Sequence, residues 1–116
     1  MGKILIVEDD ETIRNGLMIM LTIQGYIVDC AVDGKDAVEK FDDSYNLVVM
    51  DVLMPRMSGI DACRKMRDIS NVPILFLTAK SSEIDKIQGF DAGADDYIIK
   101  PFSNMELIAR IKALIR

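Results

Sequence analysis

The chain is short, apolar and acidic: it has 116 residues, half of them hydrophobic, and a formal net charge of −5. This length favours one domain, residues 1–116, around a single core, and the apolar content excludes a disordered chain. Because the sequence has no basic run, no histidine and only two cysteines, direct nucleic-acid binding and zinc or haem sites are not expected.

The first elements along the chain predict a β-α-β unit. The apolar run over residues 3–7 predicts a strand, and the helical pattern that follows over 11–24 can be capped by Asp10. The next run, 26–31, alternates in polarity because Asp29 interrupts its apolar residues. Such alternation is typical of an edge strand, whereas continuous apolar runs are typical of central strands.

Three more β-α pairs follow, which together predict a parallel sheet with helices on its faces. The remaining strands are expected over 47–51, 73–77 and 96–99, and the remaining helices over 34–41, 59–68, 82–92 and from residue 104 onward. The helix over 82–92 carries a glycine, Gly89, among its few apolar residues, so we expect it to be the least firmly packed. The last helix has a wide apolar stripe, which is explained by a broad core face or by a partner that covers part of it.

Charged residues stand where three of the predicted strands end. Glu8 and Asp9 follow the first strand, Asp51 ends the third, and Lys100 follows the fifth. The carboxyl ends of parallel strands gather at one edge of an α/β sheet, so these side chains should face one another. Acids at strand ends often only cap helices, but a cluster of them repels unless a cation lies between them. Hard oxygen ligands suit Mg²⁺, which the pattern therefore predicts.

Two further features belong to the same edge. Thr78 directly follows the fourth predicted strand, where it is either a turn residue or a hydroxyl donor to an anion, and the small Ala79 leaves room for that anion. Pro101 follows Lys100, and an X-Pro bond in a tight turn is a candidate for cis geometry.

The motifs just described occur in a fixed order: Glu8-Asp9, Asp51, Thr78-Ala79, Tyr97 and Lys100-Pro101-Phe102. In order and spacing they resemble the receiver domain of bacterial two-component response regulators, and the resemblance covers essentially the whole chain. The stretch 93–102 is most similar to the OmpR/PhoB subfamily, whose receiver precedes a winged-helix DNA-binding domain. The resemblance implies a CheY-like α/β fold, a doubly wound five-stranded parallel sheet in the order 2-1-3-4-5 with five helices.

The resemblance also implies a phosphoacceptor and a metal site. Asp51 would accept a phosphoryl group from the phosphohistidine of a sensor histidine kinase, in a reaction that requires Mg²⁺ or, in its place, Mn²⁺. The implied metal ligands are Asp51, Asp9, the carbonyl of Leu53, and Glu8 directly or through water. The protein would be a signalling switch rather than an enzyme, catalysing only its own phosphorylation and slow dephosphorylation.

Three other residues receive roles from the same resemblance. Lys100 would pair with the phosphoryl oxygens, and Thr78 would hydrogen-bond one of them. Tyr97 would be the aromatic switch that turns inward when Thr78 is drawn to the phosphoryl group. Taken alone, Tyr97 is instead an edge-strand aromatic that covers the core.

The resemblance implies a second subunit as a partner, and it implies an output domain that binds DNA. Four charged residues match positions that form charge pairs between the subunits of an activated dimer, or they belong to a solvated face: Lys86, Asp96, Glu106 and Arg110. We expect the native protein to continue into a DNA-binding output domain that controls transcription, although a stand-alone regulator is an alternative. No stretch approaches the roughly 20 apolar residues of a membrane span, and no signal peptide is visible, so a cytoplasmic location is expected.

Three rival functions use the same residues differently. A phosphohydrolase of the haloacid dehalogenase type needs a second aspartate two positions after the nucleophile, where Leu53 stands. A flavodoxin-like cofactor binder shares the topology, but Glu8 and the two aspartates after it would repel a phosphate. A protein-binding module without phosphorylation would tolerate replacement of Asp51 by alanine.

Overall fold

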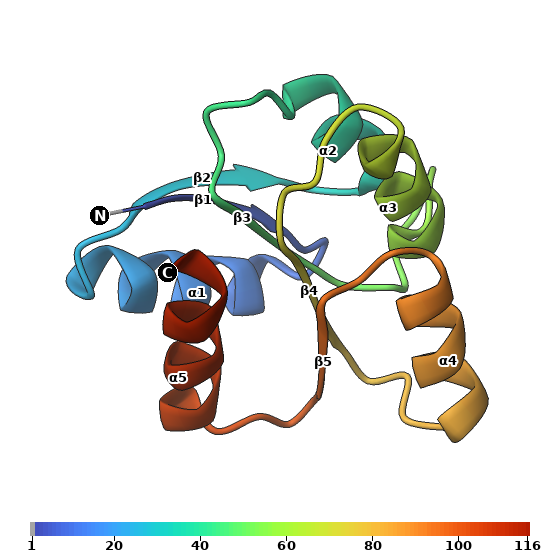
Figure 1. Cartoon of the computed structure of the whole chain (residues 1–116). Coiled ribbons are helices and arrows are strands. Elements are labelled where there is room, and N and C mark those ends of the chain that lie inside the picture. The colour runs from blue at the N-terminus through green and yellow to red at the C-terminus, as the bar shows by residue number, and fades with distance from the viewer. Residues whose placement is uncertain (1) are drawn as a thin grey trace.

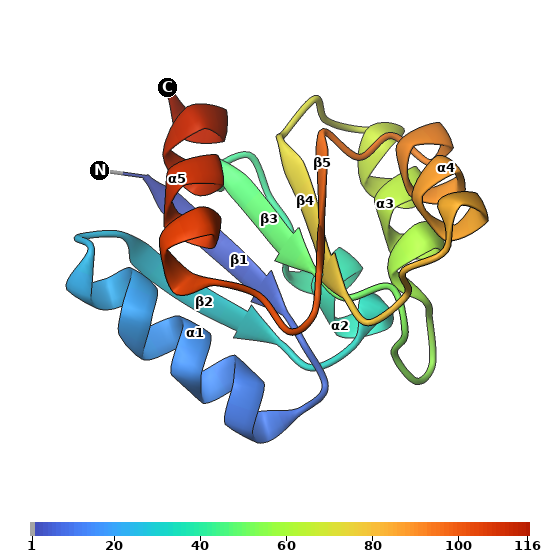
Figure 2. The same cartoon turned by 90° about the horizontal axis from the view of Figure 1, so that it is seen from below.

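Five parallel strands form the centre of the molecule, and helices cover both faces of the sheet (Figures 1 and 2). The computed structural model describes residues 2–116. In chain order the elements are β1 (Lys3–Val7), α1 (Glu11–Ile23), β2 (Ile27–Ala31), α2 (Gly34–Lys40), β3 (Leu47–Met50), α3 (Gly59–Arg67), β4 (Ile74–Thr78), α4 (Glu83–Asp91), β5 (Asp96–Ile99) and α5 (Asn104–Ile115). The strand order is β2-β1-β3-β4-β5, which confirms the doubly wound sheet that was predicted.

The burial of each strand follows its sequence. All residues of β3 and β4 are buried, as continuous apolar runs in the middle of a parallel sheet require. In β2 only the last residue, Ala31, is buried, and Ile27 is 63% exposed. The prediction that the second strand lies at the edge is therefore confirmed.

Two hydrophobic clusters fill the space between the sheet and its two helical layers. Alternate residues of β1 enter different clusters, because successive side chains of a strand point to opposite faces. Leu5 packs on the side of α2 and α3, whereas Ile4 packs on the side of α1 and α5, where it joins Leu107 and Ile111 of the last helix. Figure 2 shows α1 and α5 together on one face of the sheet and α3 and α4 together on the other.

The helix α4 exposes its large apolar residues to solvent. Its three large apolar residues are exposed, with exposed fractions of 68% for Ile84, 52% for Ile87 and 48% for Phe90. Gly89 is its one buried residue, and a Cβ there would lie 2.9 Å from Cε2 of Tyr97. The only buried position of this helix is thus a glycine, which agrees with the expected weak packing.

Helix ends use the expected side chains. Asp10 accepts a hydrogen bond from the N–H of Ile13 at 2.9 Å, and Asp33 accepts one from the N–H of Asp36 at 2.8 Å. The bond between Lys100 and Pro101 is cis, in agreement with its identification as a candidate. None of the helices in residues 2–116 combines the length and apolar character that crossing a bilayer requires.

Candidate functional site: an acidic pocket with one lysine

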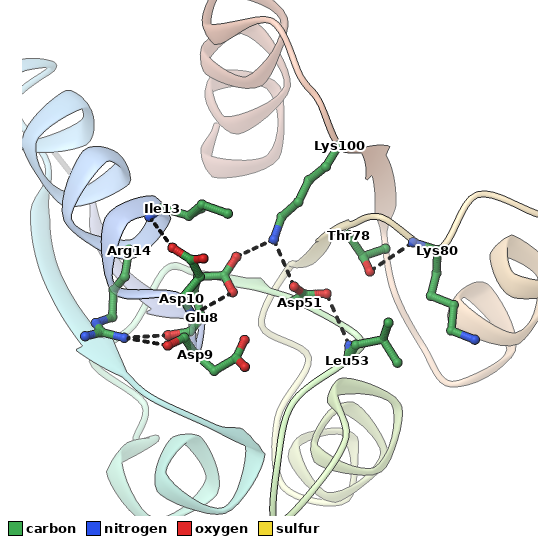
Figure 3. A network of polar contacts seen from close by, with 10 residues as sticks. All are labelled: Glu8, Asp9, Asp10, Ile13, Arg14, Asp51, Leu53, Thr78, Lys80 and Lys100. Carbon is green, nitrogen blue, oxygen red and sulfur yellow. Dashed lines mark hydrogen bonds and ion pairs between the residues drawn. The ribbon is translucent and has the colours of Figure 1, made fainter.

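Three carboxylates meet at the carboxyl edge of the sheet (Figure 3). Glu8 follows β1 and Asp51 follows β3, and these two strands are neighbours in the sheet. Oxygens of Glu8, Asp9 and Asp51 lie within 4.8 Å of one another. Glu8 and Asp51 are buried, while Asp9 is exposed. The predicted meeting of these side chains is confirmed.

Lys100 supplies the positive charge opposite these acids. It follows β5, and its Nζ lies 2.5 Å from Oε1 of Glu8 and 2.9 Å from Oδ2 of Asp51 (Figure 3). Burial opposes the ammonium charge, but the hydrogen bonds to the two carboxylates outweigh burial and raise the pKa of Lys100. The lysine therefore stays protonated and holds the two acids together.

Glu8 responds differently to the same ion pair. Its side chain is 3% exposed, against 16% for Lys100, so removal from water has a larger effect on the carboxylate. Burial raises the pKa of Glu8, and the pairing with Lys100 only partly compensates. Because one lysine faces three acids, the pocket has an excess of negative charge, which favours an added cation.

The donor set fits a hard divalent cation. It consists of carboxylate oxygens without nitrogen or sulfur ligands, as Mg²⁺ prefers. Leu53 lies beside the cluster, since its N–H donates to Oδ1 of Asp51 at 3.1 Å, while its side chain points into solvent and is 54% exposed. The carboxyl edge is therefore an acidic pocket suited to a cation.

Thr78 and Tyr97 connect this pocket to α4. Thr78 is fully buried at the end of β4, and its Oγ1 accepts a hydrogen bond from the N–H of Lys80 at 3.3 Å (Figure 3). Tyr97 lies on β5 and donates from its hydroxyl to the carbonyl of Lys80 at 2.7 Å. Its ring packs between Phe76 and Phe90, with centroid distances of 6.1 and 6.3 Å. The threonine and the tyrosine therefore both bind the main chain of one residue, Lys80.

The four charged residues predicted for a dimer surface are only partly brought together within one chain. Arg110 pairs with Asp96 at 3.0 Å and with Glu106, one helical turn away, at 3.5 Å. Lys86 takes part in none of the ion pairs among residues 2–116. Three of the four thus form an intramolecular cluster on β5 and α5.

Sequence reasoning missed two sets of contacts near the pocket. Arg14 of α1 donates to the carbonyls of Glu8 and Asp9, at 3.0 and 3.3 Å, and so fixes the main chain after β1. Arg56, in the loop after β3, pairs with the buried Asp33. Neither contact follows from spacing along the sequence. The only available signal is that both arginines lie close to the acidic motifs.

Comparison with known proteins gives concordant matches. Residues 4–112 match the family described as response regulator receiver domain. Over 114 residues the chain is 54% identical to YrkP, an uncharacterized transcriptional regulatory protein of Bacillus subtilis, a match that covers 98% of the chain and 49% of that protein. It is 44% identical over 116 residues to a CpxR homolog, a transcriptional regulatory protein of Haemophilus influenzae, covering 100% of the chain and 51% of that protein.

The solved structures agree with the sequence matches. A two-component response regulator from Clostridium difficile has a TM-score of 0.95 and 29% identity, with 100% of this chain and 97% of that chain covered. The chain spans about half the length of the two transcriptional regulators. The match over residues 4–112, together with the fold and the acidic pocket, shows that this chain belongs to the response regulator receiver domain family.

Proposed function

We propose that the chain is a phosphorylation-activated switch and that Asp51 is its phosphoacceptor. The observation that carries this proposal is the position of Asp51, a buried carboxylate whose Oδ2 lies 2.9 Å from Nζ of Lys100 and whose Oδ1 accepts from Leu53. Phosphoryl transfer needs a positioned nucleophile and neutralised charge more than covalent chemistry by the protein. The contacts of Asp51 support the first requirement, and Lys100 supplies part of the second.

In the proposed reaction, a carboxylate oxygen of Asp51 forms a bond to phosphorus as the bond from phosphorus to the imidazole nitrogen of a kinase phosphohistidine breaks. The electron pair of that bond leaves with the imidazole. Lys100 faces the incoming phosphoryl oxygens and offsets their charge. The reaction makes the chain a substrate of its kinase and a catalyst only of its own phosphorylation and slow dephosphorylation.

Mg²⁺, or Mn²⁺ in its place, is the proposed cofactor. Asp9, Asp51, Glu8 directly or through water, and the carbonyl of Leu53 would hold it, and the bound cation would supply the charge neutralisation that Lys100 alone does not provide. This assignment rests on the oxygen-rich donor set and on the excess of three carboxylates over one lysine.

The switch would act through Lys80. If the hydroxyl of Thr78 turns to a phosphoryl oxygen, it leaves the N–H of Lys80, and the segment that also binds the hydroxyl of Tyr97 shifts. This segment leads into α4, whose one buried residue is a glycine. A change in charge at Asp51 would thus reach the surface formed by α4, β5 and α5.

That surface is our candidate for a dimer contact on activation. The exposed apolar residues of α4 and the charged residues Lys86, Asp96, Glu106 and Arg110 would contribute to it. Since the relatives are twice as long and are transcriptional regulators, we place residues 1–116 as the receiver of a cytoplasmic regulator that binds DNA through an output domain. A sensor histidine kinase would be its upstream partner.

The experiment is phosphorylation with acetyl phosphate and Mg²⁺, followed by mass spectrometry of peptides. We expect one label per chain, located on Asp51, and none on the Asp51→Asn protein. Asp43→Asn, which changes an exposed aspartate outside the pocket, should be labelled as the natural sequence is. A label on another residue, or equal labelling of the Asp51→Asn protein, would contradict the proposal.

A further inference from the structure

An ion pair between the buried Asp33 and the half-exposed Arg56 links the start of α2 to the loop that leaves the acidic pocket. Nε of Arg56 lies 2.6 Å from Oδ2 of Asp33, and Nη2 of the same arginine lies 3.2 Å from Oδ1. The Asp33 residue is 4% exposed, although it stands at a helix end where capping carboxylates normally face water. Its two oxygens receive three donors, two from Arg56 and the N–H of Asp36. This bidentate pairing is the geometry that fixes an arginine most firmly.

The loop itself, residues 52–58, begins directly after Asp51 and carries Leu53. At its base, the N–H of Gly59 donates to the carbonyl of Val52 at 2.9 Å. At its tip, the N–H of Gly34 donates to the carbonyl of Met57 at 3.2 Å. The loop is therefore held at two points, and the second point lies next to the Asp33–Arg56 pair.

The backbone at the tip adopts a conformation that needs support. Arg56 has a φ of 64°, in the left-handed region that non-glycine residues rarely occupy. A Cβ at residue 34 would collide with the carbonyl of Met57, so only glycine permits this approach of α2 to the loop. The bidentate pairing of Arg56 compensates the unfavourable backbone conformation at the same residue.

We infer that Asp33 and Arg56 form a positioning pair that sets the loop 52–58, and through it the carbonyl of Leu53, for cation binding at the acidic pocket. The inference rests on the proposed role of Leu53 as a metal ligand. Neither residue is one of the three acids of the pocket. Groups that orient metal ligands commonly change metal affinity by about 10–100-fold when they are removed.

The test uses two substitutions that change the net charge in opposite directions. Asp33→Asn retains an oxygen that caps α2, because asparagine and aspartate cap helices about equally well, and it removes one negative charge. Arg56→Gln removes one positive charge at a half-exposed side chain, which makes the chain more attractive to cations at long range. Asp95→Asn is the control: it weakens an ion pair with Arg67, of length 2.8 Å, away from the pocket.

Two quantities are measured for each protein: the dissociation constant of Mg²⁺ by calorimetry, and hydrogen exchange of the amides of the loop in Mg²⁺-free protein. Both substitutions in the pair should raise the dissociation constant about tenfold and speed exchange at Leu53 and Gly59. The double variant should bind no more weakly than either single variant, because the two residues act as a unit. Asp95→Asn should leave both quantities unchanged.

Several outcomes would overturn the inference. Affinity changes of opposite sign in the two variants would show that only charge matters, and unchanged exchange in the loop would show that the pair does not position it. An equal loss of affinity in Asp95→Asn would point to general destabilisation. Failure of the natural sequence to bind Mg²⁺ at all would instead count against the proposed function. If Asp33→Asn does not fold, the Mg²⁺ affinity of Arg56→Gln alone tests the inference. Loss of its positive charge should strengthen Mg²⁺ binding, whereas loss of loop positioning should weaken it.

Discussion

Replacement of Gly89 by alanine tests whether Tyr97 is held firmly under α4. The added Cβ would lie 2.9 and 3.0 Å from two ring atoms of Tyr97 and 3.3 Å from Phe76. Contacts below 3.0 Å require the neighbours to move, and overpacking of this kind costs about 1–3 kcal/mol. The substitution also brings a gain, because alanine is favoured over glycine within a helix by about 1 kcal/mol.

Gly16 in α1 provides a matched control, because a Cβ at that position would meet nothing within 4 Å. Gly16→Ala should therefore raise the free energy of unfolding by up to about 1 kcal/mol. At Gly89 the same gain is opposed by the collision, so we expect a net loss of up to about 2 kcal/mol. The difference between the two variants isolates the collision with the ring.

Urea denaturation followed by far-ultraviolet circular dichroism measures both free energies, since a domain of this size is expected to unfold in two states. Nuclear magnetic resonance of the Tyr97 ring protons in Gly89→Ala should show the ring displaced from its place between Phe76 and Phe90. If the two alanine variants gain the same stability, the ring is not packed against α4, and the proposed route from Lys80 to this helix loses its support.

Three other predictions concern single side chains. Lys100→Met should lower the free energy of unfolding in Mg²⁺-free buffer, because it leaves buried carboxylates unpaired. Saturating Mg²⁺ should raise the thermal midpoint more in this variant than in the natural sequence, which a Mg²⁺ titration would measure. Tyr97→Phe removes a hydrogen bond to the Lys80 carbonyl and should cost about 1 kcal/mol in urea denaturation, and no loss would mean that the bond is not formed in solution. The hydrogen bonds from Arg56 lower the pKa of Asp33 below its unfolded value of about 3.9. The ionised carboxylate therefore stabilises the fold above that pH, and this stabilisation is lost as the pH falls through the lower pKa of the folded state. Urea midpoints between about pH 5 and pH 2 should therefore fall less steeply in Arg56→Gln than in the natural sequence, and parallel curves would contradict the pairing.

The fold was predictable because the burial of each strand follows from the polarity of its own residues. The fully apolar runs of β3 and β4 lie in the centre of the sheet, and the single charge of Asp29 was enough to place β2 at the edge. The pocket was predictable for a related reason, since parallel strands place all their carboxyl ends on one side. Glu8 and Asp51, 43 positions apart, meet because their strands are adjacent.

The parts that were not predicted depend on loop conformation and on which side of a helix meets the sheet. The pairing of Asp33 with Arg56 requires a left-handed residue in the loop, and arginine gives no local signal for that conformation. The exposure of Ile84 and Ile87 was also not predictable, because periodicity identifies an apolar stripe but not the side of the helix that meets the sheet. From the sequence, Gly89 indicates only a weakly packed helix, whereas the structure shows that it makes room for an aromatic ring.

The position of α5 has a consequence for how this polypeptide reaches its native state during synthesis. One of the two clusters on the sheet joins Ile4, from the beginning of the chain, to Leu107 and Ile111, near its end. While the ribosome is still making the last helix, the apolar surface of β1 on that side has no complete cover. Contacts between such distant positions form late and slowly. Until α5 has been translated, the exposed apolar surface of β1 can therefore associate with other chains.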